Sequence, residues 1–119
     1  MTMLAFITDL FLQADVGNCV VEAGGRLKAV TSLYKFLPEL EQKPDLVLLD
    51  FGAEGISAVS LISQLTSREG RRPPVVLCAA EDQLEEARHT GADYVINKTQ
   101  VQDELRALLD QLAAQKSKS

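Results

Sequence analysis

Five short apolar runs recur along the chain, separated by amphipathic segments, and this alternation constrains the fold more than any other feature. Each run is rich in Val, Leu and Ile and is bounded by Gly, Pro or Asp. Because the runs are continuously apolar, they are typical of strands that are buried on both faces of a parallel sheet. We expect strands in residues 3–8, 19–23, 45–50, 74–79 and 94–97.

Segments between these runs have the apolar spacing of helices. Residues Ala58, Leu61, Ile62 and Leu65 lie at positions i, i+3, i+4 and i+7, which predicts one helix with these side chains on its buried face. A second stripe of the same period predicts the last helix, which the capping-box pattern of residues 99–102 opens. That stripe consists of Val101, Leu105, Leu108, Leu109 and Leu112.

Three further helices are predicted from less regular patterns. Residues 82–90 form a helix that ends at Gly91, since a glycine there can adopt a positive φ. Residues 10–16 form a short helix capped by Asp9, with a β-ribbon as the alternative. Pro38 should end or kink the remaining helix. The apolar face of that helix comprises Leu27, Val30, Leu33, Tyr34 and Leu37.

Length and charge exclude several classes of protein. The 119 residues suffice for one domain, which we place at residues 1–115, with a disordered tail at 116–119. A net charge of -5 argues against a general binder of nucleic-acid backbones. No apolar stretch reaches the roughly 18 residues of a membrane-spanning helix, and the start lacks the basic region of a signal peptide. Two cysteines without a C-x-x-C spacing are typical of a reducing cytoplasm, where we expect the protein.

Side chains able to carry chemistry follow three of the expected strands. Asp9 comes after the first strand, Asp50 ends the third, and Lys98 follows the fifth. In an open α/β sheet ligands bind at the carboxyl ends of the strands, so we expect these groups to converge. Two convergent carboxylates repel one another unless a cation lies between them, and Mg²⁺ prefers such oxygen ligands. A lysine across the site could pair with a carboxylate or with a phosphoryl oxygen.

Simpler interpretations exist for the same residues. Asp50 can cap the end of its strand and accept backbone hydrogen bonds, and Asp9 is well placed as the N-cap of a helix. Lys98 can be a surface lysine, although its position favours a salt bridge to Asp50. The lone histidine, His89, cannot complete a Ser-His-Asp or Cys-His set, and neither a G-x-G-x-x-G motif nor a phosphate-binding loop occurs. We therefore do not expect an enzyme.

Three segments resemble the receiver domain of two-component response regulators, of the chemotaxis-regulator type. Residues 43–50 are similar to the strand that ends in the phospho-accepting aspartate. Residues 22–25 are similar to the second strand and its turn, and residues 91–98 to the segment that ends in the site lysine. The resemblance implies a three-layer, flavodoxin-like α/β fold with five parallel strands in the order 2-1-3-4-5.

The resemblance also implies roles for the residues at the edge of the sheet. Asp50 would be the phospho-acceptor, and Lys98 would contact the acyl phosphate. Asp9 and Asp50 would be ligands of Mg²⁺, and Gly52 would supply a carbonyl ligand. Charge neutralisation is the physical reason for such a set, since the attacking carboxylate must meet an anionic donor.

Several positions depart from the pattern of the family. Two adjacent acidic residues usually follow the first strand, where this chain has Thr8 and Asp9. A Ser or Thr hydroxyl usually ends the fourth strand, where this chain has Ala79. The aromatic switch residue is replaced by Val95 and the proline after the lysine by Thr99, and the first helix is expected to be shorter than usual. The pattern is that of a pseudo-receiver, with the fold kept and the switch partly dismantled.

From this pattern we expect a stand-alone, divergent receiver that signals through protein–protein contacts, with weak or absent phosphorylation and a weak Mg²⁺ site. Its partner would be a histidine kinase, a phosphotransfer protein or a scaffold, bound through the fourth helix, fifth strand and fifth helix. Nucleic-acid binding and membrane insertion are not expected, and a homodimer is compatible with the sequence. Two alternatives stay open: a phospho-accepting receiver at Asp50, and a small-molecule-binding module, which a sizeable pocket at the carboxyl ends of the strands would favour.

Overall fold

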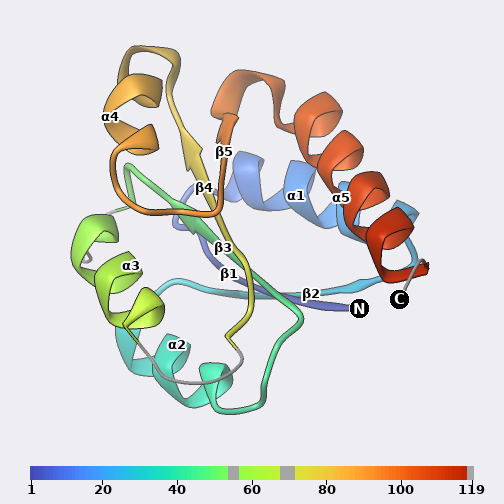
Figure 1. The fold of residues 1–119 in the computed structure, drawn as a ribbon, viewed down its shortest axis with the longest axis horizontal. Coiled ribbons are helices and arrows are strands. Elements are labelled where there is room, and N and C mark those ends of the chain that lie inside the picture. The colour runs from blue at the N-terminus through green and yellow to red at the C-terminus, as the bar shows by residue number, and fades with distance from the viewer. Residues whose placement is uncertain (54–56, 68–71, 118–119) are drawn as a thin grey trace.

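The computed structural model describes residues 1–53, 57–67 and 72–117 (Figure 1). Strands and helices alternate along these residues. The strands are β1 (Thr2–Phe6), β2 (Arg26–Val30), β3 (Leu46–Asp50), β4 (Val75–Ala79) and β5 (Tyr94–Asn97). The helices are α1 (Leu10–Glu22), α2 (Leu33–Leu40), α3 (Ala58–Thr66), α4 (Leu84–Arg88) and α5 (Val101–Ser117), with short 3₁₀ turns η1 (Glu81–Gln83) and η2 (Lys98–Gln100).

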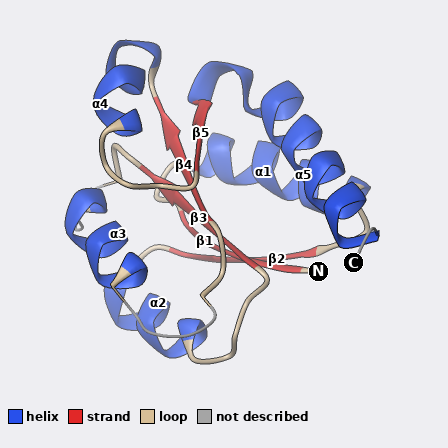
Figure 2. Ribbon diagram, viewed as in Figure 1, coloured by secondary structure: helices blue, strands red, loops and turns tan. Residues whose placement is uncertain are grey.

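All of these strands belong to one parallel sheet in the order β2-β1-β3-β4-β5, which confirms the predicted fold and strand order. Helices α1 and α5 cover one face, and α2, α3 and α4 cover the other (Figure 2). The central strand β3 is buried along its whole length. Its alternate residues supply the two cores, Leu46 and Leu48 beneath α1 and α5, and Val47 and Leu49 beneath the other helices.

The second strand does not lie where the apolar-run pattern predicts it. Residues 19–23 form the last turn of α1 and its C-cap, and Cys19 and Val20 are buried there. The strand itself, β2, lies at an edge of the sheet and pairs only with β1. Its exposed positions carry the charged residues Arg26 and Lys28. A search for continuously apolar runs overlooks such an alternating strand.

Helix α1 is longer than the sequence pattern predicts. It has 13 residues, so the short helix at residues 10–16 and the β-ribbon alternative are both wrong. Residues 22–25, which resemble the second strand and its turn, instead lead out of α1, and Gly24 there has a φ of 80°. The buried residues of the helix are Leu12, Val16, Cys19 and Val20, so the apolar run is its core-facing end.

Helix α2 begins later and continues further than predicted. Leu27 and Val30 belong to β2, and Pro38 does not end the helix, which runs on to Leu40. Phe36 and Leu40 are buried whereas Pro38 is exposed. Packing of the two buried side chains therefore holds the last turn, although the proline supplies no backbone donor.

The C-terminal half follows the predictions more closely. Gly91 has a φ of 93°, as predicted for the glycine that follows the α4 segment. Helix α5 extends to Ser117 and so overlaps the predicted tail, whose boundary at residue 115 stays a prediction. No helix in the described part of the chain is long and apolar enough to cross a membrane.

Candidate functional site

Asp50 and Lys98 meet at the carboxyl edge of the sheet. Asp50 is the last residue of β3 and is 2% exposed, and Lys98 directly follows β5. Strand β4 lies between them, with Cys78 paired to Asp50 on one side and to Ile96 on the other. The Lys98 side chain spans this gap, and its Nζ lies 2.9 Å from Asp50 Oδ1. The structure therefore brings together two of the residues singled out in the sequence.

The ion pair compensates for the burial of a carboxylate. A charge withdrawn from water is costly unless it is paired and hydrogen-bonded. Asp50 Oδ1 accepts a hydrogen bond from the backbone N–H of Gly52 at 3.1 Å, in addition to its contact with the Lys98 ammonium. This backbone bond is the one that the simpler interpretation of Asp50 predicts. The Lys98 side chain is 28% exposed, whereas that of Asp50 is 2% exposed, so the pair lies at the border of the buried interior.

Gly52 contacts the site through its amide group. A Cβ at this position would lie 3.8 Å from Lys98 Nζ and 3.9 Å from Asp50 Oδ1, which is ordinary van der Waals contact. The loop after β3 therefore passes close to the ion pair without requiring a glycine for space. The role of the Gly52 carbonyl as a metal ligand stays a prediction.

Asp9 is the N-cap of α1, as the simpler interpretation of this residue predicts. Its Oδ1 accepts hydrogen bonds from the backbone N–H groups of Phe11 at 2.9 Å and Leu12 at 3.3 Å. These two donors belong to the first turn of the helix, where no intrahelical acceptor exists for them. One oxygen of the candidate metal ligand is thus already engaged by the fold.

The candidate Mg²⁺ ligands already have partners within the protein. Among the residues in the three described ranges, no group of three or more His, Cys, Asp and Glu side chains is arranged so that it could hold a metal. Asp50 Oδ1 already accepts from an ammonium and an amide, and Asp9 Oδ1 caps a helix. Mg²⁺ sheds water reluctantly and depends on carboxylate charge, so these contacts compete with a metal ion for the two candidate carboxylates.

Comparisons with known proteins place the fold. No protein-family model matches the chain, and no curated protein matches it. Solved structures do: the receiver domain of the TMAO respiratory system response regulator TorR has a TM-score of 0.79 and 19% identity over 96% of this chain and 97% of that chain. A signal receiver domain from Bermanella marisrubri has a TM-score of 0.77 and 19% identity over 95% of both chains. This chain has the receiver fold.

A third receiver structure bears on the metal. The receiver domain of a sensor histidine kinase from Pseudomonas aeruginosa has a TM-score of 0.77 and 20% identity, over 92% of this chain and 94% of that one. That domain was crystallised with a magnesium ion coordinated in its active-site cleft. At this level of identity the likeness concerns the fold, and the chemistry of each site depends on its own residues.

Ala79 and Val95 are apolar residues that pack into the core. Ala79, at the end of β4, is 1% exposed and contributes only a methyl group to the core beneath α2, α3 and α4. Val95 packs against the same core, whereas the neighbouring Tyr94 packs against the core beneath α1 and α5. Because adjacent strand residues point to opposite faces, Tyr94 does not bring its ring to the face of Val95.

Cys78 shows how closed this edge of the sheet is. The pKa of the Cys78 thiol is raised to about 12, chiefly by burial, with a smaller contribution from the negative charge of Asp50 that the positive charge of Lys98 opposes. The thiol is therefore protonated at neutral pH and behaves as a small apolar side chain. Cys78 is a structural residue between the two partners of the ion pair.

The sequence reasoning missed the role of Asn97. The last helix, α5, begins within the predicted segment 99–102, but the 3₁₀ turn before it has its own cap: Asn97 caps η2, and its Oδ1 accepts from the backbone N–H of Thr99 at 3.0 Å. Helical structure thus begins at Lys98, and α5 follows at Val101. An Asn that ends an apolar strand directly before a helix was the available signal.

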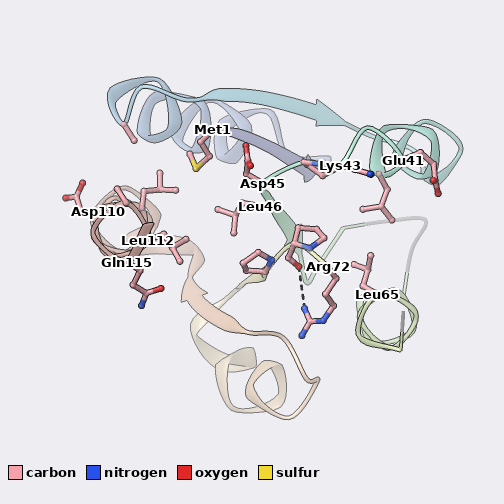
Figure 3. A pocket seen from close by; sticks show the side chains of 17 residues that line it. Met1, Glu41, Lys43, Asp45, Leu46, Leu65, Arg72, Asp110, Leu112 and Gln115 are labelled. Atoms are coloured by element: carbon pink, nitrogen blue, oxygen red, sulfur yellow. Dashed lines mark hydrogen bonds between the residues drawn. The ribbon is translucent and has the colours of Figure 1, made fainter. Parts of the chain in front are cut away.

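A hollow of about 1230 Å³ lies at the opposite, amino-terminal edge of the sheet (Figure 3). The residues that line it include Met1, Asp45 and Pro74, which directly precede β1, β3 and β4. Neither Asp50 nor Lys98 lines it. The small-molecule alternative, which predicts a pocket at the carboxyl ends of the strands, gains no support from this hollow.

Proposed function

We propose that this chain is a signalling module that acts through protein–protein contacts in two-component or phosphorelay signalling, with weak or absent phosphorylation of Asp50. The buried Asp50–Lys98 ion pair keeps the central carboxylate and ammonium of a receiver site together, which supports a signalling role. The expectation of weak phosphorylation rests on Thr8, Ala79 and Val95, which replace the groups that surround this pair in the family pattern. Such a module binds and responds to a partner and is not an enzyme.

Slow phosphoryl transfer follows from the charges at the site. An attacking carboxylate and an anionic donor repel one another, so catalysis depends on positioning and on electrostatic stabilisation of the transferred group. Lys98 supplies one positive charge. Ala79 offers no hydroxyl, and a hydrogen bond to a charged oxygen is typically worth roughly 1.5–3 kcal/mol. We therefore expect any acyl phosphate on Asp50 to form slowly.

Weak binding of Mg²⁺ belongs to the same proposal. Asp50, Asp9 and the Gly52 carbonyl are the groups that would hold the ion, and with Thr8 in place of an acid they supply two carboxylates. When bound, the ion would neutralise part of the donor's negative charge. We expect an affinity in the millimolar range or weaker, since ligand charge offsets the cost of removing water from Mg²⁺.

The partner is a protein: a histidine kinase, a phosphotransfer protein, a scaffold or a second copy of the chain. The net charge of -5 disfavours a nucleic-acid partner. Cys19 and Cys78 are both free and buried, which suits a reducing cytoplasm. The expected contact face on α4, β5 and α5 stays a prediction, because the large exposed hydrophobic side chains of the described residues lie elsewhere. They are Met1, Leu10, Phe11, Val21, Leu33, Tyr34, Leu37 and Val59.

The test combines a metal titration with a phosphodonor assay. The protein is titrated with Mg²⁺ and followed by NMR, and is then incubated with Mg²⁺ and a small phosphodonor and read by intact mass. The Asp50→Asn variant is the control for modification elsewhere. Millimolar affinity and little or no Asp50-dependent mass gain support the proposal. Micromolar affinity with a rapid, Asp50-dependent gain would overturn it in favour of a phospho-accepting receiver, which the retained ion pair also fits.

A restoration variant sharpens this test. Thr8 is exposed, so Thr8→Asp adds a carboxylate without burying a charge. If the missing acid limits the site, the variant should bind Mg²⁺ more tightly than the parent chain, and the gain should vanish in Thr8→Asn, which has similar size and no charge. Equal affinity in all three proteins would show that Thr8 is not the limiting position.

A further inference from the structure

The residues on either side of Lys98 are bonded to each other. Asn97, at the end of β5, is 7% exposed. Its Oδ1 accepts one hydrogen bond from the backbone N–H of Thr99 at 3.0 Å and another from the Thr99 hydroxyl at 2.8 Å. The chain at Lys98 is therefore closed into a tight turn by its own two neighbours.

A second tie reaches this turn from α5. Glu104, in the first turn of that helix, is half-buried, and its Oε1 accepts a hydrogen bond from the backbone N–H of Asn97 at 3.2 Å. The backbone donor and the side-chain acceptor of Asn97 are thus both engaged. The turn that carries Lys98 is fixed to the strand before it and to the helix after it.

These hydrogen bonds matter because the Lys98 side chain must extend past the end of β4 to contact Asp50. Its ammonium sits on a flexible four-carbon stem and crosses the end of β4 to meet a buried carboxylate. Ordering a lysine side chain has one of the larger entropic costs, and a mobile backbone would add to it. We propose that Asn97, together with Thr99 and Glu104, acts as a positioning residue that sets the backbone of Lys98 so that Nζ meets Asp50 Oδ1.

The proposal concerns the placement of Lys98 alone. It holds whether or not Asp50 accepts a phosphoryl group, so the failure of the phosphodonor experiment and the failure of this inference are distinguishable. It also differs from simple helix capping, which would stabilise α5 without any effect on the lysine.

The experiment measures how accessible the Lys98 amine is to acetylation in the folded protein. Each variant is treated with a limiting amount of acetic anhydride, and the extent of acetylation at Lys98 is divided by that at the exposed Lys43 by peptide mass spectrometry. Loss of the ion pair in Asp50→Asn sets the upper value of this ratio. We expect Asn97→Ala to raise the ratio by about threefold or more towards that value, because the charge-assisted contact is loosened. The conservative Asn97→Ser, which keeps a capping oxygen, should restore a low ratio.

Two further variants keep the inference falsifiable. Ser32→Ala removes the cap of α2, whose Oγ accepts from the Lys35 N–H, and should lower the melting temperature without a change in the ratio. Thr99→Val removes only the hydroxyl donor and should raise the ratio to a smaller extent, so it serves if Asn97→Ala does not fold. A ratio equal to that of the parent chain in folded Asn97→Ala, or in folded Thr99→Val, would reduce Asn97 to an ordinary cap and overturn the proposal.

Discussion

The corner between β1 and α1 and the corner between β5 and α5 both use a polar side chain to start helical structure, with different results for the site. At the first corner Asp9 itself is the cap, and its Oδ1 accepts from two backbone N–H groups. At the second corner Asn97 is the cap, one residue before Lys98. Lys98 carries only hydrogen-bond donors and could not serve as this cap, and its ammonium pairs with Asp50.

At the end of a strand, side chains can be needed both to cap the following helix and to bind a ligand. The first backbone N–H groups of every helix need an acceptor, so some residue at each corner must supply one. When the candidate functional residue supplies it, that residue loses part of its capacity to bind a ligand. When an adjacent residue supplies it, the functional group takes no part in starting the helix.

The largest expected effect is on the free energy of unfolding, and it concerns the central strand of the sheet that connects the two corners. Leu48 lies in the central strand, is fully buried and pairs with Ala5 of β1 and Val76 of β4. Leu48→Ala should lower the free energy of unfolding by roughly 2–5 kcal/mol, measured by urea denaturation. Leu27→Ala in the edge strand β2, where the side chain is only half-buried, should cost less. Similar small losses in both variants would mean that β3 is not the buried central strand of the sheet that carries both corners.

The next largest effect concerns the second corner. Lys98→Ala leaves the Asp50 carboxylate buried without its cation, so we expect a loss of about 2–3 kcal/mol, below the range for fully buried pairs because Lys98 is partly exposed. The double variant with Asp50→Asn, which removes the uncompensated charge, should recover part of this loss. A double-mutant cycle in urea denaturation measures the coupling. If the two losses simply add, the ion pair contributes nothing to stability.

The first corner supplies the contrasting variant. Asp9→Ala removes the cap of α1 and should lower the free energy of unfolding by about 1 kcal/mol, measured by thermal or urea denaturation. The acetylation ratio of Lys98 should stay at the value of the parent chain, in contrast to Asn97→Ala. A rise in the ratio after Asp9→Ala would mean that the two corners are not independent.

An ion pair at the amino-terminal edge gives the smallest effect and serves as a reference away from both corners. The Arg72 guanidinium holds Asp93 through two contacts of 2.8 and 3.1 Å, and the backbone N–H of Val75 donates to the same carboxylate at 2.7 Å. The Arg72 hydrogen bond, aided by that of Val75, lowers the pKa of Asp93 below its ordinary value of 3.8. Because the folded pKa is the lower one, the stabilisation is present above that ordinary value and is lost as the pH falls through the folded one.

We therefore expect Asp93→Asn to lower the free energy of unfolding by about 0.5–1 kcal/mol at neutral pH, since both partners are partly exposed. The difference between the parent chain and the variant should shrink in strong acid, as measured by urea denaturation at several pH values. A difference that stays constant with pH would mean that the carboxylate charge makes no contribution.

Much of the fold could be predicted because burial leaves a direct trace in the sequence. The continuously apolar β3, the stripes of α3 and α5, and the run that ends at Asn97 are all found close to their predicted positions. The predictions failed for β2 and for the end of α1. Strand β2 alternates between exposed and more buried residues, and the apolar end of α1 has the composition of a strand. The search for apolar runs therefore assigned the second strand to the end of α1 and overlooked β2.

The convergence of Asp50 and Lys98 was determined by the sequence alone, because parallel strands end at one edge and both residues follow apolar runs. Two features were decided only by tertiary structure. Sequence alternation shows that Tyr94 and Val95 point to opposite faces, but the helices packed on each face decide which core each one joins. The sequence indicated Asp9 as the cap of the first helix, whereas Asn97 as the cap of the turn at Lys98 emerged only from the folded backbone. The physical reason is that hydrogen bonds of this kind depend on where backbone donors point, which is established only once the strands and helices have packed.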